Sequence, residues 1–262
     1  MMRPDTIILL FALIGGLTMW EYTSLVNNIE GVTVNRLIST IATVVFIFGV
    51  AGWRTGLVNG FAGIVPYIIT IVYLFIAELY LKQPNPINDW AYTMLGQMYV
   101  TLPFALIFFL AFQIDIMNGA TFDMLLPLSL FIFLWVNDSG AYCVGSLIGK
   151  HKLFPRISPG KTWEGSIGGG VLVLIVAGVI GYFANNNPAN PHLMSMPQWI
   201  GFGAVVAVFG TWGDLVESLF KRTLGIKDSG NILPGHGGML DRFDSSLLAI
   251  PASVIYLYAL TA

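Results

Sequence analysis

The chain has 262 residues, of which 56% are hydrophobic and only 10% are charged, and its formal net charge is −2. A soluble domain usually carries about 25% charged residues, so this composition excludes an ordinary water-soluble protein and favours a chain solvated largely by a lipid bilayer. The few lysines and arginines argue against a nucleic-acid partner, because such proteins carry a basic face. The single cysteine, Cys143, cannot form an internal disulfide or a thiolate metal cluster.

Eight apolar stretches have the length that a helix needs to cross a bilayer, which is roughly 17–25 residues. They are continuous rather than alternating and are longer than barrel strands, so they predict helices. The predicted spans are residues 7–26, 37–53, 57–81, 95–113, 123–147, 166–185, 197–219 and 245–261. Arg54 alone separates the second and third spans, which allows a tight hairpin. The predicted fold is an all-α polytopic membrane bundle, a single domain over residues 1–262.

The basic residues are distributed unevenly between the two sides of this predicted bundle. Ten of the twelve lysines and arginines lie in the loops after the first, third, fifth and seventh spans. Because basic residues concentrate in cytoplasmic loops, these loops are expected to face the cytoplasm, with both termini on the other side. Most of the charged residues lie within 135–165 and 211–245, and both regions are expected on the cytoplasmic side.

The first polar segment follows the fifth span. Asp138 lies near the end of a membrane helix, where a carboxylate costs energy unless it is paired or bound to a ligand. Residues 158–165 combine hydroxyls, glycine and Lys161 before an apolar helix, an arrangement that suits phosphate binding by backbone N–H groups. A plain basic turn, broken by Pro159 and Gly160, is equally compatible. The Gly-Lys-Thr in this segment is not a Walker loop, because the upstream glycine spacing is absent.

A second set of polar residues lies inside the seventh span. Asp214, Glu217 and Ser218 have the spacing that places them on one helical face. Two carboxylates on a membrane helix are costly, so they are candidates for a function such as binding a divalent cation. The alternative is a salt bridge, for example to Lys221 or Arg222.

The third segment, residues 218–244, mixes cations, acids, glycines and a histidine. Carboxylate oxygens suit Mg²⁺, which typically takes one or two carboxylates plus substrate phosphates. Nucleotidyl and phosphoryl transfer require such a combination of metal-binding acids and phosphate-binding cations. Gly235, Gly237 and Gly238 allow the backbone to approach a ligand closely or to adopt a positive φ. His236 has no partner visible in the sequence, and a turn cap, a phosphate hydrogen bond and stacking all stay open.

Residues 218–244 also resemble the signature of the phosphatidate cytidylyltransferase (CDP-diacylglycerol synthase) family. That pattern reads Ser-x-x-Lys-Arg, four residues, Lys-Asp, then Pro-Gly-His-Gly-Gly, two residues and Asp-Arg-x-Asp, and every fixed position is present. Residues 138–142 and 157–165 are similar to further family segments, and Trp20-Glu21-Tyr22 is similar to a short patch at the end of an early helix. The resemblance covers at least residues 130–250. Gly160 stands where the family often has a second basic residue, and the first family helix has no counterpart.

The resemblance implies roles for individual residues. The implied metal ligands are Asp214, Asp241 and Asp244, with Mg²⁺ as the cofactor and the identity of a second cation left open. The implied catalytic residues are Asp214, Asp241, Asp244, Lys221 and Arg222. The implied substrate-binding residues are Asp138, Ser158, Lys161, Thr162, Ser218, Lys227, Asp228, His236, Gly237, Gly238 and Arg242.

The resemblance also implies a helical bundle with a polar cavity that faces the cytoplasm and the inner leaflet. The implied reaction joins CTP and phosphatidate to form CDP-diacylglycerol and pyrophosphate, in a cavity lined by spans five to eight. Other CTP-dependent lipid enzymes, such as a polyprenol kinase or a cytidylyltransferase for another lipid backbone, stay open as alternatives. A cation transporter and a non-catalytic membrane scaffold are less favoured, because the acids accompany a basic, glycine-rich loop. The small size and compact loops favour the bacterial inner membrane. A homodimer is plausible, although no residue pattern indicates one.

Overall fold

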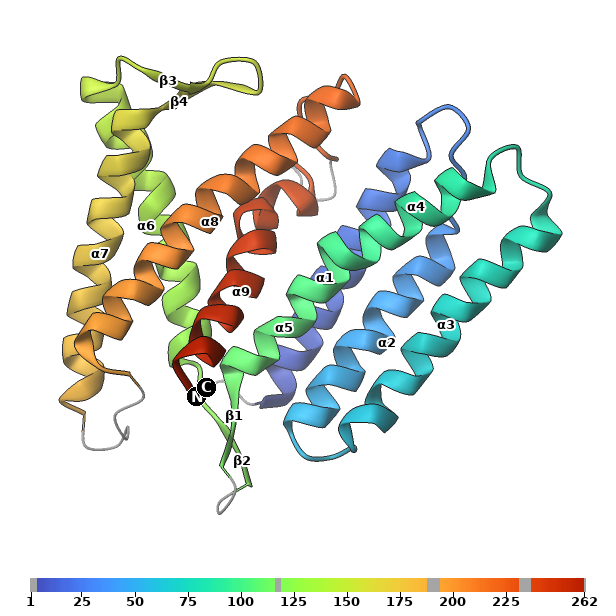
Figure 1. Cartoon of the computed structure of the whole chain (residues 1–262), viewed down its shortest axis with the longest axis horizontal. Coiled ribbons are helices and arrows are strands. Elements are labelled where there is room, and N and C mark those ends of the chain that lie inside the picture. The colour runs from blue at the N-terminus through green and yellow to red at the C-terminus, as the bar shows by residue number, and fades with distance from the viewer. Residues whose placement is uncertain (1–3, 116–118, 188–193, 231–236, 262) are drawn as a thin grey trace. The chain divides into compact units, whose positions relative to one another are not determined.

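The computed structural model describes residues 4–115, 119–187, 194–230 and 237–261 (Figure 1). Within these ranges, eight helical segments are long and apolar enough to cross a membrane, which confirms the predicted number. The first four segments are α1 (Pro4–Val26), α2 (Arg36–Arg54), α3 (Gly60–Leu81) and the run formed by α4 (Pro86–Gly96), the π-helical turn η1 (Gln97–Thr101) and α5 (Leu102–Ala111). The last four are α6 (Leu125–Ile148), α7 (Trp163–Asn185), α8 (Met196–Thr223) and α9 (Met239–Thr261).

The fourth membrane segment was predicted to begin near residue 95, but it begins at Pro86. Asn85 caps its first turn by accepting a hydrogen bond from the Asn88 N–H, and proline suits the first helical position. Polar residues inside the segment hid this part from a search for apolar runs. Asp89, for example, is buried, and its side chain accepts a hydrogen bond from the Thr33 N–H.

Two helices continue beyond the apolar runs that predicted them. Helix α8 ends at Thr223, and α9 begins at Met239. Lys221 and Arg222 therefore lie on the last turn of α8, where cations interact favourably with the helix C-terminus. Asp241 lies in the first turn of α9, where an acid is favoured.

Two short antiparallel hairpins lie between the membrane segments and were not predicted. Strand β1 (Phe112–Asp115) pairs with β2 (Gly119–Phe122), and β3 (Lys152–Phe154) pairs with β4 (Ser158–Thr162). The second hairpin connects α6 to α7 and aligns Lys152 opposite Thr162. Such short strands leave the all-α class of the membrane-spanning part unchanged.

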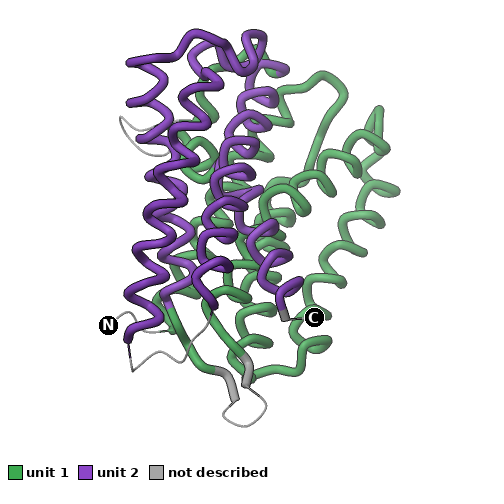
Figure 2. Tube along the Cα trace, turned by 60° about the vertical axis from the view of Figure 1, so that its left-hand side comes forward, with its two compact units in different colours: residues 1–123, 224–243 green, residues 124–223, 244–262 purple. Residues whose placement is uncertain are grey.

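The chain divides into two compact units (Figure 2). Unit 1 comprises residues 1–123 and 224–243, and unit 2 comprises residues 124–223 and 244–262. Each unit draws on two separate stretches of the chain, so a cut at one position would not separate them. A single polytopic domain over residues 1–262 stays a prediction.

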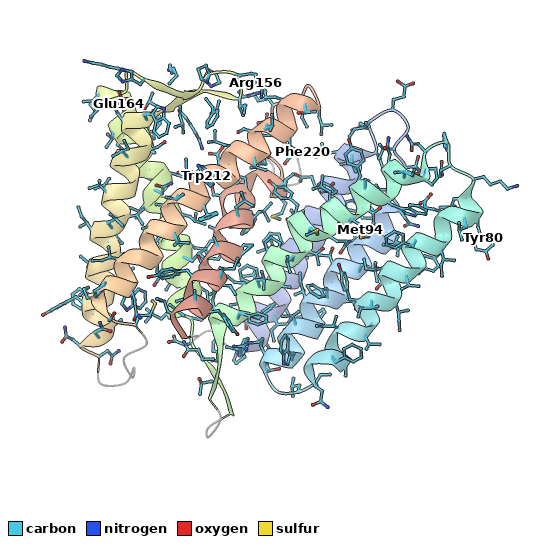
Figure 3. All side chains as sticks on the ribbon, viewed as in Figure 1. Tyr80, Met94, Arg156, Glu164, Trp212 and Phe220 are labelled. Carbon is cyan, nitrogen blue, oxygen red and sulfur yellow. The ribbon has the colours of Figure 1, made fainter. Side chains whose placement is uncertain are left out.

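Large apolar side chains are exposed along the described helices (Figure 3). Tyr80 on α3 is 80% exposed and Trp212 on α8 is 54% exposed. So large an exposed apolar surface would favour aggregation in water, whereas a lipid bilayer solvates it. The length and the composition of the helices together identify an integral membrane protein.

Glycine pairs allow helices within a unit to pack closely. In unit 1, a Cβ added at Gly49 of α2 would lie 2.0 Å from the carbonyl oxygen of Gly63 on α3. These two helices form the tight hairpin that the position of Arg54 suggested, with turn residues Thr55 to Asn59 between them.

The Gly49→Ala substitution is expected to destabilise the protein by about 1–3 kcal/mol, because the added methyl group meets backbone that cannot rotate away. The measurement is the unfolding midpoint of the purified protein in detergent. Gly178→Ala on α7 is the matched control, because a Cβ there meets no atom within 4 Å. Equal midpoints for the two variants would contradict the close packing of α2 and α3.

Candidate active site

A polar cavity of about 510 Å³ lies within unit 2, between α6, β4, α7 and α8. Its polar lining residues include Asn137, Asp138, Lys161, Thr162, Thr211 and Asp214. The Asn137 side chain donates to the Thr211 hydroxyl at 3.1 Å, which connects α6 to α8 across the cavity wall. The cavity therefore brings together four of the residues predicted to bind substrate or metal, namely Asp138, Lys161, Thr162 and Asp214.

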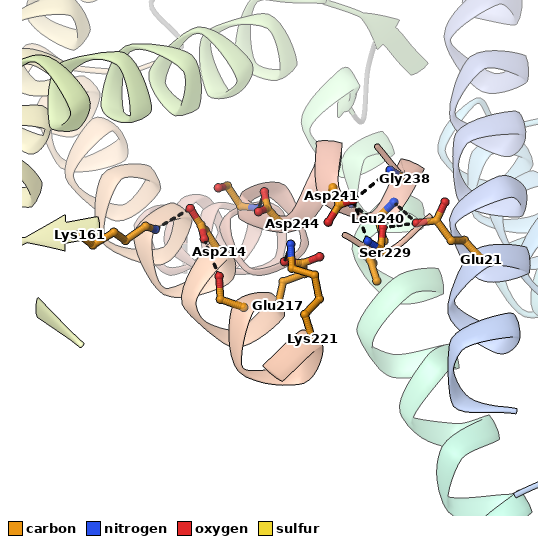
Figure 4. A network of polar contacts seen from close by, with 12 residues as sticks. Glu21, Lys161, Asp214, Glu217, Lys221, Ser229, Gly238, Leu240, Asp241 and Asp244 are labelled. Carbon is orange, nitrogen blue, oxygen red and sulfur yellow. Dashed lines mark hydrogen bonds and ion pairs between the residues drawn. The ribbon is translucent and has the colours of Figure 1, made fainter. Parts of the chain in front are cut away.

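Two carboxyl groups line this cavity, and a third, from α9, interacts with both of them. Asp138 of α6, Asp214 of α8 and Asp244 of α9 interact electrostatically with one another and with Lys161. The Lys161 Nζ lies 2.6 Å from Asp214 Oδ2, and the Ser218 hydroxyl donates to Asp214 Oδ1 at 3.2 Å (Figure 4). Acids that are buried close to one another repel when ionised, and a divalent cation would relieve that repulsion.

Glycines bring these acids together. A Cβ at Gly213 would lie 2.7 Å from the Asp244 carbonyl oxygen. The backbones of α8 and α9 therefore approach closely next to Asp214 and Asp244. Between α6 and α7, a Cβ at Gly169 would lie 2.5 Å from the Asn137 carbonyl oxygen. The close packing of α6 on α7 sets Asp138 beside the segment that carries Lys161.

The β3–β4 hairpin positions Lys161 immediately before α7. Thr162 caps α7, because its hydroxyl accepts a hydrogen bond from the Gly165 N–H at 3.2 Å. Glu164 accepts hydrogen bonds from the backbone N–H groups of Lys150 and His151, which ties the helix start to the end of α6. The segment predicted as a phosphate-binding turn is therefore mostly a strand, and Ser158 is not among the residues that line the cavity.

Glu217 takes the salt-bridge alternative rather than joining Asp214. Its buried carboxylate lies 2.6 Å from the Lys221 Nζ, one turn further along the same helix. Ser218, and not Glu217, is the residue of this helical face that contacts Asp214. The catalytic role implied for Lys221 stays a prediction.

Asp241 lies in unit 1, at the start of α9, within a separate network of hydrogen bonds (Figure 4). Its Oδ2 accepts from the backbone N–H groups of Ser229 and Gly238, each at 2.9 Å. Its own N–H donates to the Ser229 hydroxyl at 3.3 Å. Because both oxygen bonds come from the backbone, the loop and the first helical turn together fix the position of this carboxylate.

The sequence interpretation missed Glu21, which lies at the centre of this network. The carboxylate of Glu21 on α1 accepts hydrogen bonds from the Ser229 hydroxyl, from the Met239 N–H at 2.8 Å and from the Leu240 N–H at 3.2 Å. An acid in an apolar helix was the signal that could have identified it. Its partner residues, however, lie more than 200 positions further along the chain, and local sequence patterns do not reveal contacts between such distant positions.

The remaining predicted residues are placed as follows. Lys227 and Asp228 are exposed in the segment after α8, and Arg242 is exposed on α9. Gly237 has a φ of 80°, a backbone conformation that favours glycine. His236 lies outside the described residues.

Mg²⁺ fits the chemistry of the unit 2 cluster. Among the described side chains, no group of three His, Cys, Asp or Glu residues forms a ready metal cage. Mg²⁺ does not require one, because it usually binds one or two carboxylates and takes its other ligands from water and substrate phosphates. The carboxyl groups of Asp214 and Asp244, with that of Asp138 interacting with both, meet that requirement. The binding of Mg²⁺ by Asp241 stays a prediction.

The fold and the site define a polytopic membrane protein with an acidic, lysine-containing site suited to phosphate groups. Residues 1–260 match the model of the cytidylyltransferase family, and the chain therefore belongs to that family. It is 51% identical over 123 residues to the phosphatidate cytidylyltransferase of Staphylococcus aureus, a match that covers 46% of this chain and 44% of that relative. It is 43% identical over 138 residues to the phosphatidate cytidylyltransferase of Haemophilus influenzae, covering 52% of this chain and 47% of the relative. The matched segments thus span less than half of these relatives.

Proposed function

We propose that this protein is a phosphatidate cytidylyltransferase, which converts CTP and phosphatidate into CDP-diacylglycerol and pyrophosphate. Family membership and the names of the relatives support this activity. The structural observation that carries the proposal is the 510 Å³ cavity lined by Asp138, Lys161 and Asp214, with Asp244 interacting electrostatically with all three. Acids for a metal ion beside a cation for phosphates are the groups that nucleotidyl transfer requires.

In this proposal an oxygen of the lipid phosphate attacks the α-phosphorus of CTP. A new phosphorus–oxygen bond forms, the bond between the α- and β-phosphates breaks, and pyrophosphate leaves with the electron pair. A phosphate dianion is already a nucleophile near neutral pH, so the protein need not supply a general base. Its main contribution is to position the two phosphates and to neutralise their charge.

The residues have separate tasks in this reaction. Lys161 binds a phosphate group of CTP. Thr162, at the start of α7, orients that phosphate group. The proposed Mg²⁺ ligands are Asp214, Asp241 and Asp244, and bound Mg²⁺ supplies neutralisation of phosphate charge. The proposed phosphate-binding cations are Lys221, Arg222, Lys227 and Arg242. Orientation of this site toward the cytoplasm of a bacterial inner membrane, predicted from the basic loops, is part of the proposal.

The experiment uses the full chain purified in detergent, with CTP, phosphatidate and Mg²⁺, and detects the lipid product by mass spectrometry. We expect CDP-diacylglycerol and pyrophosphate in equal amounts, and no product after the metal is chelated. A phosphorylated lipid without cytidine would instead support a CTP-dependent kinase. Absence of any lipid product from a folded protein, with several phospholipid acceptors tried, would contradict the proposal.

A further inference from the structure

The carboxylate of Glu21 is buried in unit 1, with only 4% of the residue exposed. Among the described residues, its hydrogen-bond partners are a hydroxyl and two backbone N–H groups rather than a cation. A buried carboxylate is costly unless it is well hydrogen-bonded, so such a group is retained where its bonds contribute to structure or function.

Glu21 caps helix α9, whose preceding residue has no side chain that could accept a hydrogen bond. The first N–H groups of a helix lack partners within the helix, and a side chain at the preceding residue usually accepts from them. The residue before α9 is Gly238, which has no side chain. Glu21 supplies the missing acceptor from α1, because it binds the N–H groups of the first two residues of α9, Met239 and Leu240. A carboxylate is also favoured there by the positive end of the helix dipole.

The glycine before α9 is required by the carboxylate of Glu21. A Cβ at Gly238 would lie 2.0 Å from Glu21 Oε1 and 2.1 Å from the Ser229 hydroxyl oxygen. A Cβ at Gly230 would lie 2.9 Å from Glu21 Oε2. From the sequence, the glycines of this segment were expected to allow close approach of a ligand or a positive φ. The structure adds a second reason for Gly238, which is the close approach of a side chain from the first helix.

Ser229 connects Glu21 to Asp241. Its hydroxyl donates to Glu21 and accepts from the Asp241 N–H, while its own N–H donates to Asp241 Oδ2. The second bond to Asp241 Oδ2 comes from Gly238, the residue that packs against Glu21. The hydrogen bonds that the Asp241 carboxylate accepts from Ser229 and Gly238 therefore both come from residues in contact with Glu21.

We propose that Glu21 is a positioning residue, which caps α9 and holds Ser229 so that the Asp241 carboxylate is fixed for the reaction. The inference rests on the proposed function, because it takes Asp241 to act in nucleotidyl transfer. Glu21 itself does not touch substrate in this account. Misplacement of a reacting group by about 1 Å can cost roughly 100-fold in rate, so the loss of this support is expected to be measurable.

The test compares Glu21→Gln with Glu21→Asp and with Glu78→Gln, which alters another buried glutamate of unit 1. Two quantities are measured for each folded variant: hydrogen exchange of the Met239 and Leu240 amides, and the values of kcat and KM for CTP. Both oxygens of Glu21 accept hydrogen bonds, and in Glu21→Gln an NH2 group replaces one of them, so at least one bond at the start of α9 is lost. For this variant we expect exchange about 10-fold faster or more and kcat lower by roughly 10- to 100-fold, with KM within about twofold of wild type. Glu21→Asp is expected to recover part of both losses, and Glu78→Gln to show neither.

Wild-type exchange at these amides in Glu21→Gln would overturn the proposal, and so would faster exchange with an unchanged kcat. If Glu21→Gln does not fold, Ser229→Ala removes only the connecting hydroxyl and is expected to show the same two effects at smaller size. An unchanged Ser229→Ala would then overturn the proposal. If the wild-type protein forms no cytidine-containing lipid, the proposed function fails, whereas the exchange measurement still decides whether Glu21 caps α9.

Discussion

The Asp241→Asn substitution is expected to reduce kcat by about 100- to 1,000-fold while the protein stays folded in the membrane. The side-chain oxygen of Asn can still accept the backbone hydrogen bonds that Asp241 receives from Ser229 and Gly238. The substitution therefore removes the negative charge and preserves the local structure. If that charge is needed to bind Mg²⁺, turnover is lost although the fold is retained.

The measurement is the rate of CDP-diacylglycerol formation, with the unfolding midpoint in detergent as the test of folding. Glu30→Gln, which neutralises an exposed acid after α1, is the control and is expected to keep wild-type activity. Full activity of Asp241→Asn would contradict the assignment of Asp241 as a metal ligand.

The second large effect is expected for Lys161→Met, which should lower kcat/KM for CTP by about 100-fold or more. Lys161 lines the cavity and is ion-paired with Asp214. Its ammonium is the cation that this site offers to a phosphate group in the proposed reaction. Its loss also leaves Asp138, Asp214 and Asp244 with less compensation, so CTP, which is itself anionic, meets stronger repulsion.

Lys152→Met is the matched control, because Lys152 lies on the neighbouring strand β3 but is exposed and does not line the cavity. Steady-state kinetics over a range of CTP concentrations compares the two variants. The account predicts a large loss for Lys161→Met and a small one for Lys152→Met. Similar losses for both would indicate that only the total charge of the hairpin matters.

The number of membrane helices could be predicted because apolar length is a property of the sequence itself. The start of the fourth segment could not, since Asp89 makes residues 86–94 look polar until its partner is known. Asp89 is buried and accepts a hydrogen bond from the Thr33 N–H. The extension of α9 to Met239 had a similar cause, because its first turn is polar and is stabilised by a residue of α1.

The candidate site could be predicted in part. The family signature and the cost of intramembrane acids identified Asp138, Asp214 and Asp244, and the structure brings these carboxylates together in unit 2. The β3–β4 hairpin that presents Lys161 was not predicted, because Pro159 and Gly160 favour a turn. Glu21 was quoted only as part of a short family-like patch. Its role depends on contacts between distant parts of the chain, which periodicity and local motifs do not report.

The most direct test of nucleotidyl transfer compares CTP labelled in the α-phosphate with CTP labelled in the γ-phosphate. Purified wild-type protein is incubated with phosphatidate and Mg²⁺, and label in the lipid phase is measured. The account predicts that the α-label enters the lipid and that the γ-label leaves in pyrophosphate. Transfer of the γ-label to lipid without the α-label would contradict it and would identify a kinase instead.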